Sequence, residues 1–182
     1  MFREIELRSQ LATYATLDPL EYEHLTHMRA LCESVARPLD RGTFAPGHFT
    51  ASAFILSPDR SALLLILHGK LGMWLQPGGH VDADDPSLLA AALREVREEV
   101  GLVDLTLELP GPFDLDVHDI PARRTEPAHQ HFDVRFLLRA GSLEVTAASD
   151  AKAARWVPLD RLNTELTDQS VLRAVDKLRA AL

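Results

Sequence analysis

Three glutamates in one short segment are the residues of this chain best suited to metal-assisted chemistry. Glu95, Glu98 and Glu99 occupy positions i, i+3 and i+4, so on a helix their carboxylates project from one sector. Like charges at this spacing repel one another, and divalent cations would remove that repulsion. Because carboxylate oxygens are ligands for hard cations, we expect Mg²⁺, or alternatively Mn²⁺, as the cofactor.

The segment that carries these glutamates has the pattern of an amphipathic helix. Its apolar residues recur at spacings of three and four and predict a face that packs on a core; they are Leu89, Leu93, Val96 and Val100. Asp85 followed by Pro86 predicts the start of the helix, and Gly101 predicts its end. We therefore expect the three carboxylates to be held on a helix of fixed orientation.

A glycine loop, Gln76-Pro77-Gly78-Gly79, stands before this helix, and its glycines permit the close approach of a ligand. The loop, the run Arg94-Glu95-Val96-Arg97-Glu98-Glu99 and the pair Gly101-Leu102 together resemble the signature box of the Nudix family. The second half of the family pattern matches fully. The first half differs, because Asp85 stands where the family has a glutamate and one extra residue precedes Arg94.

This resemblance implies roles for the residues of the box. Glu95 and Glu99 are expected to bind the metal, with the Gly79 carbonyl as an additional ligand. Glu98 is expected either as a further ligand or as the base that acts on water. Arg94 is expected to take part in catalysis by orienting a carboxylate through charge-assisted hydrogen bonds. A base from a later loop is the alternative, and the candidates are Glu126, His129 and Glu165.

The resemblance also implies an activity. We expect hydrolysis of the diphosphate linkage in a nucleoside diphosphate joined to another moiety, with water activated by the divalent metal. One alternative is an enzyme similar to diphosphate-compound isomerases, although Gly78 stands where isopentenyl diphosphate isomerases carry a catalytic cysteine. The other is a nucleotide-binding sensor that retains the fold, although all three box glutamates are present.

Four histidines form a second group of candidate ligands. His129 and His131 alternate on a predicted strand and so share one face, while His80 follows the glycine loop and His48 begins another strand. We expect either a second metal site or a phosphate-contacting site from these four. Their placement also resembles the metal positions of isopentenyl diphosphate isomerases. Ordinary polar histidines of the surface or core are the third alternative.

Three further residues are candidates for substrate binding. Arg123 and Arg124 lie between prolines in the polar loop 121–127 and could meet phosphate oxygens. His118 lies on the strand before this loop. We expect the loop to be mobile and to help select the substrate, and a solvated loop without that role is the alternative.

The remaining elements predict an α/β fold. Strands are predicted at 49–56, 62–67, 102–109, 113–120, 132–138 and 155–159, and Asp168 is expected to cap a closing helix. This order resembles the Nudix α/β/α sandwich with a mixed β-sheet. Residues 1–47 are predicted to be an N-terminal helical extension, with Asp18-Pro19 as a helix start, and residues 48–182 to be the Nudix domain. Trp156 is expected in the core.

Composition limits the partners. The 182 residues include 27 acidic and 19 basic ones, and the net charge of −8 disfavours a nucleic acid polymer. The single Cys32 excludes an internal disulfide.

We find no signal-peptide pattern and no apolar run long enough for a bilayer, so we expect a cytoplasmic protein without membrane contact. The expected partner is a small-molecule nucleoside diphosphate derivative. The N-terminal extension is expected to be a packed appendage, with a homodimer contact or a lid as alternatives.

Overall fold

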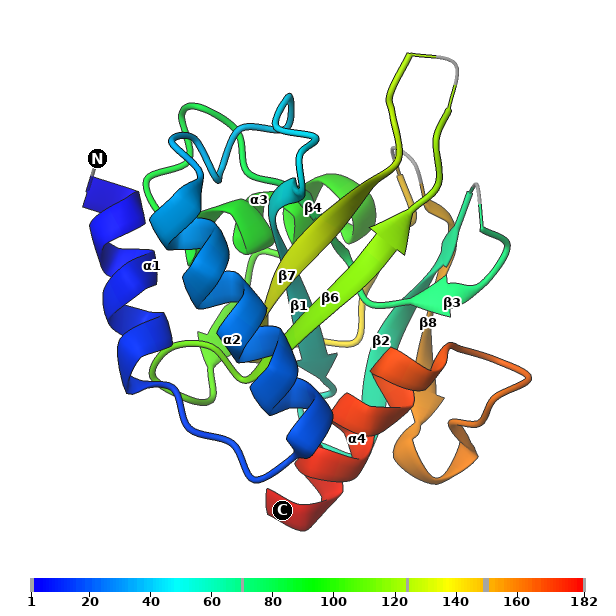
Figure 1. Cartoon of the computed structure of the whole chain (residues 1–182). Coiled ribbons are helices and arrows are strands. Elements are labelled where there is room, and N and C mark those ends of the chain that lie inside the picture. The colour runs from blue at the N-terminus through cyan, green and yellow to red at the C-terminus, as the bar shows by residue number, and fades with distance from the viewer. Residues whose placement is uncertain (1, 70, 124, 149–150, 182) are drawn as a thin grey trace. The chain divides into compact units, whose positions relative to one another are not determined.

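The chain contains both helices and strands, as expected for an α/β protein (Figure 1). The computed structural model describes residues 2–69, 71–123, 125–148 and 151–181. The helices are α1 (Phe2–Thr13), α2 (Pro19–Ser34), α3 (Leu88–Val100), α4 (Gln169–Ala181) and the short 3₁₀ helix η1 (Leu159–Arg161). The strands are β1 (Gly47–Leu56), β2 (Ala62–His68), β3 (Trp74–Leu75), β4 (Gly78–His80), β5 (Leu105–Leu107), β6 (Asp114–Ile120), β7 (His129–Ala140) and β8 (Ala151–Pro158). They pair in the order β3-β2-β1-β7-β5, with β4 on β1, β6 on β7 and β8 on β2.

Several predicted ends of elements are confirmed. Asp18 accepts a hydrogen bond from the Glu21 N–H over 2.8 Å at the start of α2, and Pro19 takes the first helical position. Asp168 likewise caps α4. Gly101 ends α3 with a φ of +72°, a left-handed conformation that glycine adopts without a steric penalty. The hairpin of β1 and β2 is also present as an antiparallel pair.

The predicted start of α3 is wrong. The helix begins at Leu88, and the Ser87 hydroxyl accepts the Ala90 N–H over 3.1 Å. Asp85 instead accepts the Asp82 N–H over 2.8 Å and so closes the turn before the helix. Serine and aspartate are both good helix caps, and here the serine lies closer to the apolar stripe.

Several predicted strands have different lengths in the structure, among them β5 and β7. β7 begins at His129 rather than at Phe132, because β6 pairs with it as far as the partners Ile120 and His129. Cross-strand pairing thus extends the strand through a polar stretch that has little strand propensity of its own. β5 covers three of the eight predicted residues, and these three pair with residues 138–140 of β7.

The chain divides into two compact units. The first comprises Met1–Ser52, Gly79–Ala92 and Gly111–Phe136, and the second comprises Ala53–Gly78, Leu93–Pro110 and Leu137–Leu182. β1, β4, β7 and α3 contribute residues to both units. The first unit holds both N-terminal helices together with β6, and the second holds β2, β3, β5, β8 and α4.

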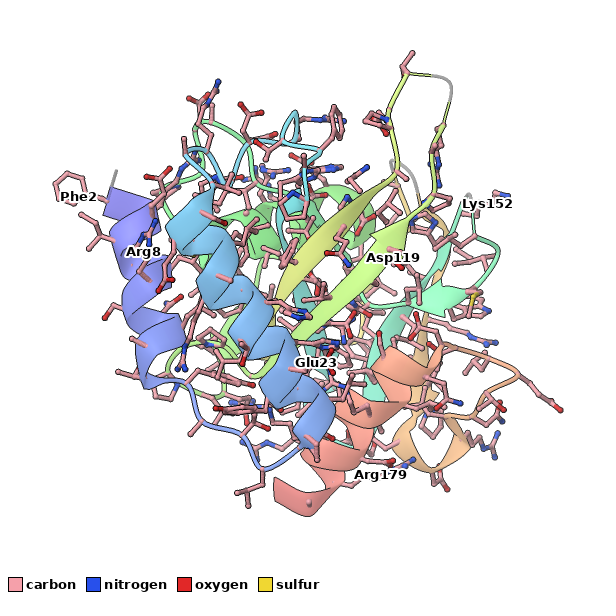
Figure 2. All side chains as sticks on the ribbon, viewed as in Figure 1. Phe2, Arg8, Glu23, Asp119, Lys152 and Arg179 are labelled. Atoms are coloured by element: carbon pink, nitrogen blue, oxygen red, sulfur yellow. The ribbon has the colours of Figure 1, made fainter. Side chains whose placement is uncertain are left out.

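In the first unit, α1 and α2 lie side by side, and α2 packs on β6 (Figure 1). Their inner faces are apolar, and Leu11 and Met28 are at most 1% exposed. Phe2 lies on the outside of α1 and is 89% exposed (Figure 2). Cys32 is buried in α2, as expected of a small apolar residue.

In the second unit, β2 pairs antiparallel with β8 and also with β3. Leu63, Leu64 and Leu65 at the centre of β2 are fully buried. α4 contributes a buried apolar stripe with Val171 and Val175. Among the helices of the described residues, none is both long and apolar enough to cross a membrane.

Candidate active site

The three glutamates of α3 differ in their surroundings. Val96 and Val100 are fully buried and fix the orientation of the helix. Glu99 lies near this apolar face and is 7% exposed. The Glu95 side chain is 17% exposed, whereas that of Glu98 is 47% exposed. The helix therefore presents a series of carboxylates that runs from a buried to an accessible position.

Two sets of hydrogen bonds hold these carboxylates. Glu99 accepts the backbone N–H of Gly78 over 3.0 Å, so the acidic helix is tied to the glycine loop. The Arg94 guanidinium donates to Glu95 over 2.9 Å and to Glu98 over 3.2 Å. Arg94 therefore contacts two carboxylates of the helix, and its expected role in catalysis stays a prediction. Arg97 is exposed on the same helix.

The chemistry of this donor set fits a hard divalent cation. Three carboxylates supply oxygen ligands, and Arg94 offsets part of the negative charge of the two that it bridges. Glu95, Glu98 and Glu99 offer the oxygen ligands that suit Mg²⁺ or Mn²⁺, and their role as ligands stays a prediction. The Gly79 carbonyl stays a proposed additional ligand.

Three histidines of the first unit come together. His48, His80 and His131 each offer a ring nitrogen, and these three atoms lie within 4.8 Å of one another. In the described part of the chain, this is the one trio of potential ligands at that spacing. His129 lies beside them, with its Nε2 3.3 Å from the Nε2 of His131. The structure therefore gathers the four histidines that the sequence pattern singles out.

Backbone carbonyls fix the orientation of two of these rings. His48 Nδ1 donates to the Thr43 carbonyl over 3.0 Å, and His129 Nδ1 donates to the Pro127 carbonyl over 2.8 Å. In each neutral ring the lone pair is then on Nε2. His48 is 1% exposed, and its Nε2 is buried without a hydrogen-bond partner.

The imidazoles of His48, His80 and His131 favour the neutral state. Burial, together with the charges of neighbouring histidines, lowers the pKa of His80 to about 4 and the pKa of His131 to about 2. Burial also lowers the pKa of His48. Because metal ligation requires an unprotonated nitrogen, these rings are in a suitable state at neutral pH.

Asp133 belongs to a different group, although it alternates with His129 and His131 along β7. Its carboxylate accepts hydrogen bonds from Thr50 over 3.0 Å and from Ser52 over 2.6 Å. Arg135 donates to it over 3.0 Å. His129 and His131 on one side and Asp133 on the other therefore belong to two separate polar clusters, although all three alternate along β7.

Arg135, which is 2% exposed, was not among the residues predicted from the sequence. Its guanidinium also contacts Asp114 and Asp116, each at 3.1 Å. Burial alone would raise the pKa of Asp116, but the charge of Arg135 and a hydrogen bond from His118 hold it well below its usual range. One feature of the sequence could have pointed to Arg135. It is an arginine within an apolar strand, and the strand opposite contains alternating aspartates.

The substrate-binding candidates lie around the β6–β7 hairpin. His118 is directly opposite His131 on the paired strands, and its Nδ1 is 3.0 Å from the Asp116 carboxylate. Arg123 exchanges two backbone hydrogen bonds with Glu126 in the connecting loop. Arg124 lies outside the described residues. The structure thus places His118 beside the histidine group and Arg123 at the tip of the hairpin.

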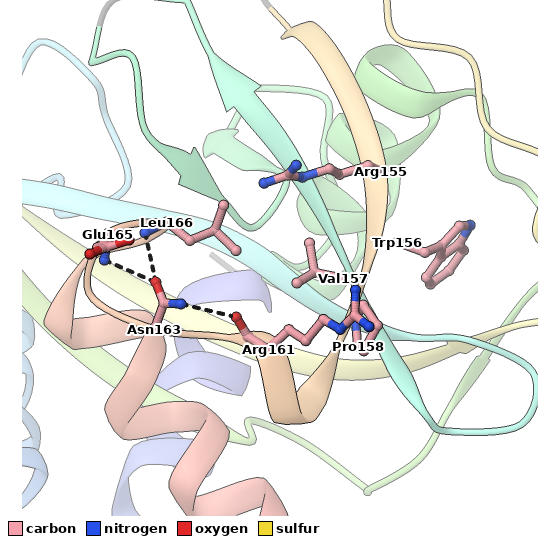
Figure 3. A pocket seen from close by; sticks show the side chains of 8 residues that line it. All are labelled: Arg155, Trp156, Val157, Pro158, Arg161, Asn163, Glu165 and Leu166. Carbon is pink, nitrogen blue, oxygen red and sulfur yellow. Dashed lines mark hydrogen bonds between the residues drawn. The ribbon is translucent and has the colours of Figure 1, made fainter.

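A cavity of about 480 Å³ lies in the second unit (Figure 3). Its lining includes Trp156, which is only partly buried, so the expectation that this residue belongs to the core is wrong. The indole N–H donates to the Leu143 carbonyl over 2.9 Å, an exposed hydrogen bond that leaves the ring partly accessible. Glu165, a candidate base, also lines this cavity.

Comparisons with known proteins agree with this fold. The family model described as the NUDIX domain matches residues 46–177. The chain is 33% identical over 146 residues to a probable DHNTP pyrophosphohydrolase of Lactococcus lactis subsp. cremoris, covering 79% of this chain and 83% of the relative.

Two solved structures are also similar. A NUDIX-family hydrolase from Clostridium perfringens has a TM-score of 0.60 and 23% identity, covering 79% of this chain and all of that one. A MutT NUDIX hydrolase from Burkholderia pseudomallei has a TM-score of 0.55 and 27% identity, covering 71% of this chain and 96% of that one.

The chain therefore belongs to the Nudix family. It has the α/β Nudix fold with a mixed sheet, to which α1 and α2 are added at the N-terminus. Its activity class is that of a Nudix pyrophosphohydrolase.

Proposed function

We propose that this enzyme hydrolyses the diphosphate linkage of a nucleoside diphosphate joined to another moiety, and that it requires Mg²⁺ or Mn²⁺. The arrangement of the box carries the proposal. Glu99 is buried and tied to the glycine loop, Arg94 bridges Glu95 and Glu98, and the Glu98 carboxylate faces solvent. Such a set combines fixed ligands with one carboxylate accessible to water.

Each residue of the box has its own role in the proposed reaction. A bound divalent cation would neutralise phosphate oxygens and increase the acidity of water. Glu95 and Glu99 hold their carboxylates in place for that cation. Glu98, as the most exposed of the three, accepts the proton of the attacking water. Arg94 fixes the orientation of the Glu98 carboxylate by a hydrogen bond of 3.2 Å.

The isomerase alternative lacks a suitable thiol. Gly78 occupies the position where that reaction would need a cysteine, and its backbone N–H is used by Glu99. Burial raises the pKa of the Cys32 thiol, which lies within α2. A buried thiol of this kind is unreactive.

A second candidate substrate is dihydroneopterin triphosphate. The name of the Lactococcus relative favours it, since this relative is similar over most of both chains. A pterin triphosphate and a nucleoside diphosphate conjugate share a phosphoanhydride beside a flat ring system. The same carboxylates would act on either one.

The test is a panel of substrates assayed with Mg²⁺ and with Mn²⁺, with products identified by mass. The panel includes sugar nucleotides, dinucleoside polyphosphates, nucleoside triphosphates, coenzyme conjugates and dihydroneopterin triphosphate. The proposal predicts a monophosphate and a phosphorylated remainder from a nucleoside diphosphate conjugate. Preferential release of pyrophosphate from the pterin would favour the second candidate. Cleavage that continues undiminished after removal of divalent ions by a chelator would contradict both.

A further inference from the structure

We propose that His48, His80 and His131 form a binding site for Zn²⁺ in the first unit, separate in composition from the glutamates of α3. The proposal does not depend on the identity of the hydrolysed substrate. It rests on the convergence of three imidazoles, on an unpartnered buried nitrogen and on a glycine that brings two strands together.

The spacing of the ring nitrogens suits a small tetrahedral ion. Zn–N bonds of about 2.0–2.1 Å place the nitrogens of a tetrahedral site about 3.3–3.4 Å apart. The three candidate nitrogens lie within 4.8 Å of one another. Small rotations of the rings would close this difference, because their centroids are already 4.9–5.2 Å apart.

His48 supplies independent evidence for a ligand. Its Nδ1 donates to the Thr43 carbonyl, and its Nε2 is buried with no hydrogen-bond partner. An unsatisfied buried polar nitrogen costs stability. A cation bound at Nε2 would satisfy it, and the carbonyl behind Nδ1 is the kind of partner that orients a metal-binding histidine.

His129 has the geometry of a positioning residue. The Pro127 carbonyl fixes its Nδ1–H, so its Nε2 can accept a hydrogen bond from His131 Nε2–H over 3.3 Å. This bond would leave the lone pair of His131 on Nδ1. A backbone carbonyl and a neighbouring imidazole thus set the tautomers of two rings in the group.

The backbone brings these rings together at Gly47. A Cβ at this position would lie 1.9 Å from the Gln130 carbonyl oxygen, a distance that no side chain can occupy. Gln130 also donates its backbone N–H to the Pro46 carbonyl over 2.9 Å. The start of β1 therefore lies in close backbone contact with β7. As a result, His48 lies beside His129 and His131, which flank Gln130.

The ligand chemistry favours zinc over magnesium. Neutral imidazole is a good ligand for Zn²⁺, whereas Mg²⁺ prefers oxygen. Three histidines also leave a fourth position, which water or the oxygen of a ligand takes in sites of this kind. The two sets of residues should therefore differ in metal preference.

The first experiment is elemental analysis of the full chain purified without a histidine tag, followed by removal of metal and titration with Zn²⁺ against a chromophoric chelator. We expect bound zinc at about one ion per chain. His80→Ala and His131→Ala should each weaken Zn²⁺ binding by at least about 100-fold, since each removes a ligand. His27→Ala is the matched control, because His27 is exposed on α2.

Further variants distinguish Zn²⁺ binding by the histidines from metal binding by the glutamates, and a lost ligand from a lost fold. Glu99→Gln should leave the histidine site with its Zn²⁺ affinity, and His129→Gln should weaken it less than loss of a ligand. Circular dichroism of the metal-free variants checks the fold, and His131→Gln replaces His131→Ala if the latter unfolds. Equal Zn²⁺ affinity in the wild type, His80→Ala and His131→Gln would overturn the proposal. So would binding of inorganic phosphate by the metal-free protein that these variants abolish while leaving Zn²⁺ affinity unchanged.

Discussion

The buried carboxylate of Glu99 accepts the backbone N–H of Gly78 over 3.0 Å and so links the acidic helix to the glycine loop that precedes it in the sequence. This bond fixes the position of one oxygen of the Glu99 carboxylate. A helix and a loop separated by 21 positions thereby act as one rigid part of the site.

Replacing a box glutamate by glutamine should abolish most activity without unfolding the protein. Glu98→Gln and Glu99→Gln should each lower turnover by at least ~10²-fold, as expected for loss of a base or metal ligand. Glutamine keeps the size and helix propensity of glutamate, so thermal unfolding should change little. Glu23→Gln, on the exposed face of α2, is the control. Full activity in both box variants would contradict the mechanism.

Arg94→Lys should reduce turnover more than it changes KM. Lysine cannot bridge two carboxylates as a guanidinium does, so Glu95 and Glu98 would lose their common donor. We expect turnover to fall by about 10- to 100-fold, the effect of a small misplacement at the reacting centre. Arg97→Lys, exposed on the same helix, should leave steady-state kinetics unchanged. A large rise in KM alone for Arg94→Lys would indicate direct substrate binding instead.

Replacing Arg123 and Arg124 by alanine should raise KM by about 10-fold, the value of one lost charge-assisted hydrogen bond, and should lower kcat less. The two backbone hydrogen bonds between Arg123 and Glu126 do not require the side chain, so the loop should stay closed. Arg37→Ala is a control for a lost exposed arginine, since 79% of its side chain is accessible. Unchanged kinetics across the substrate panel would remove this loop from substrate selection.

Acid should destabilise the protein partly through Asp116. Its pKa is depressed in the folded state and lies near 3.8 when the group is unperturbed. Its contribution to stability is therefore fully present above about pH 5 and is lost as the pH falls through 4 and below. In this range the unfolded state binds the proton first. Asp116→Asn should flatten the dependence of the unfolding free energy on pH below 5, measured by urea denaturation. A slope equal to that of the wild type would show that other carboxylates dominate.

Gly47→Ala should destabilise the protein, because the added methyl group would overlap the Gln130 backbone. A cost of about 1–3 kcal/mol or more is expected for such overpacking. Gly42→Ala offers a comparison, since a Cβ there would meet only the flexible Asp40 side chain at 3.3 Å. Equal denaturation midpoints for the two variants would show that β1 can move away from β7 without cost.

Much of the fold could be predicted from the sequence, because apolar periodicity and end signals such as Asp18-Pro19 and Gly101 act locally. The start of α3 was less predictable, since Asp85 and Ser87 are both competent caps and the competition depends on the turn at Asp82. Cross-strand pairing determines the lengths of β5 and β7, and a single sequence does not contain that information directly.

The candidate site was predictable to a different extent. The spacing of Glu95, Glu98 and Glu99 was enough to identify the acidic helix, but not that Glu99 would be buried and Glu98 exposed. The alternation of His129, His131 and Asp133 correctly indicated a shared strand. It could not reveal that Asp133 would be bound by Thr50 and Ser52, because those contacts join residues more than 80 positions apart.

The contact between α2 and β6 has a consequence for solubility. In the described sheet β6 pairs with β7 alone, so on its other side it has the position of an edge strand. Glu21 accepts the Leu115 N–H, and His24 donates to the Leu115 carbonyl, so two helical side chains replace one residue of a neighbouring strand. An open edge of this kind can recruit a strand from another molecule. The helical extension thus protects the sheet against edge-to-edge aggregation, and a chain shortened to remove it would expose a template for self-association.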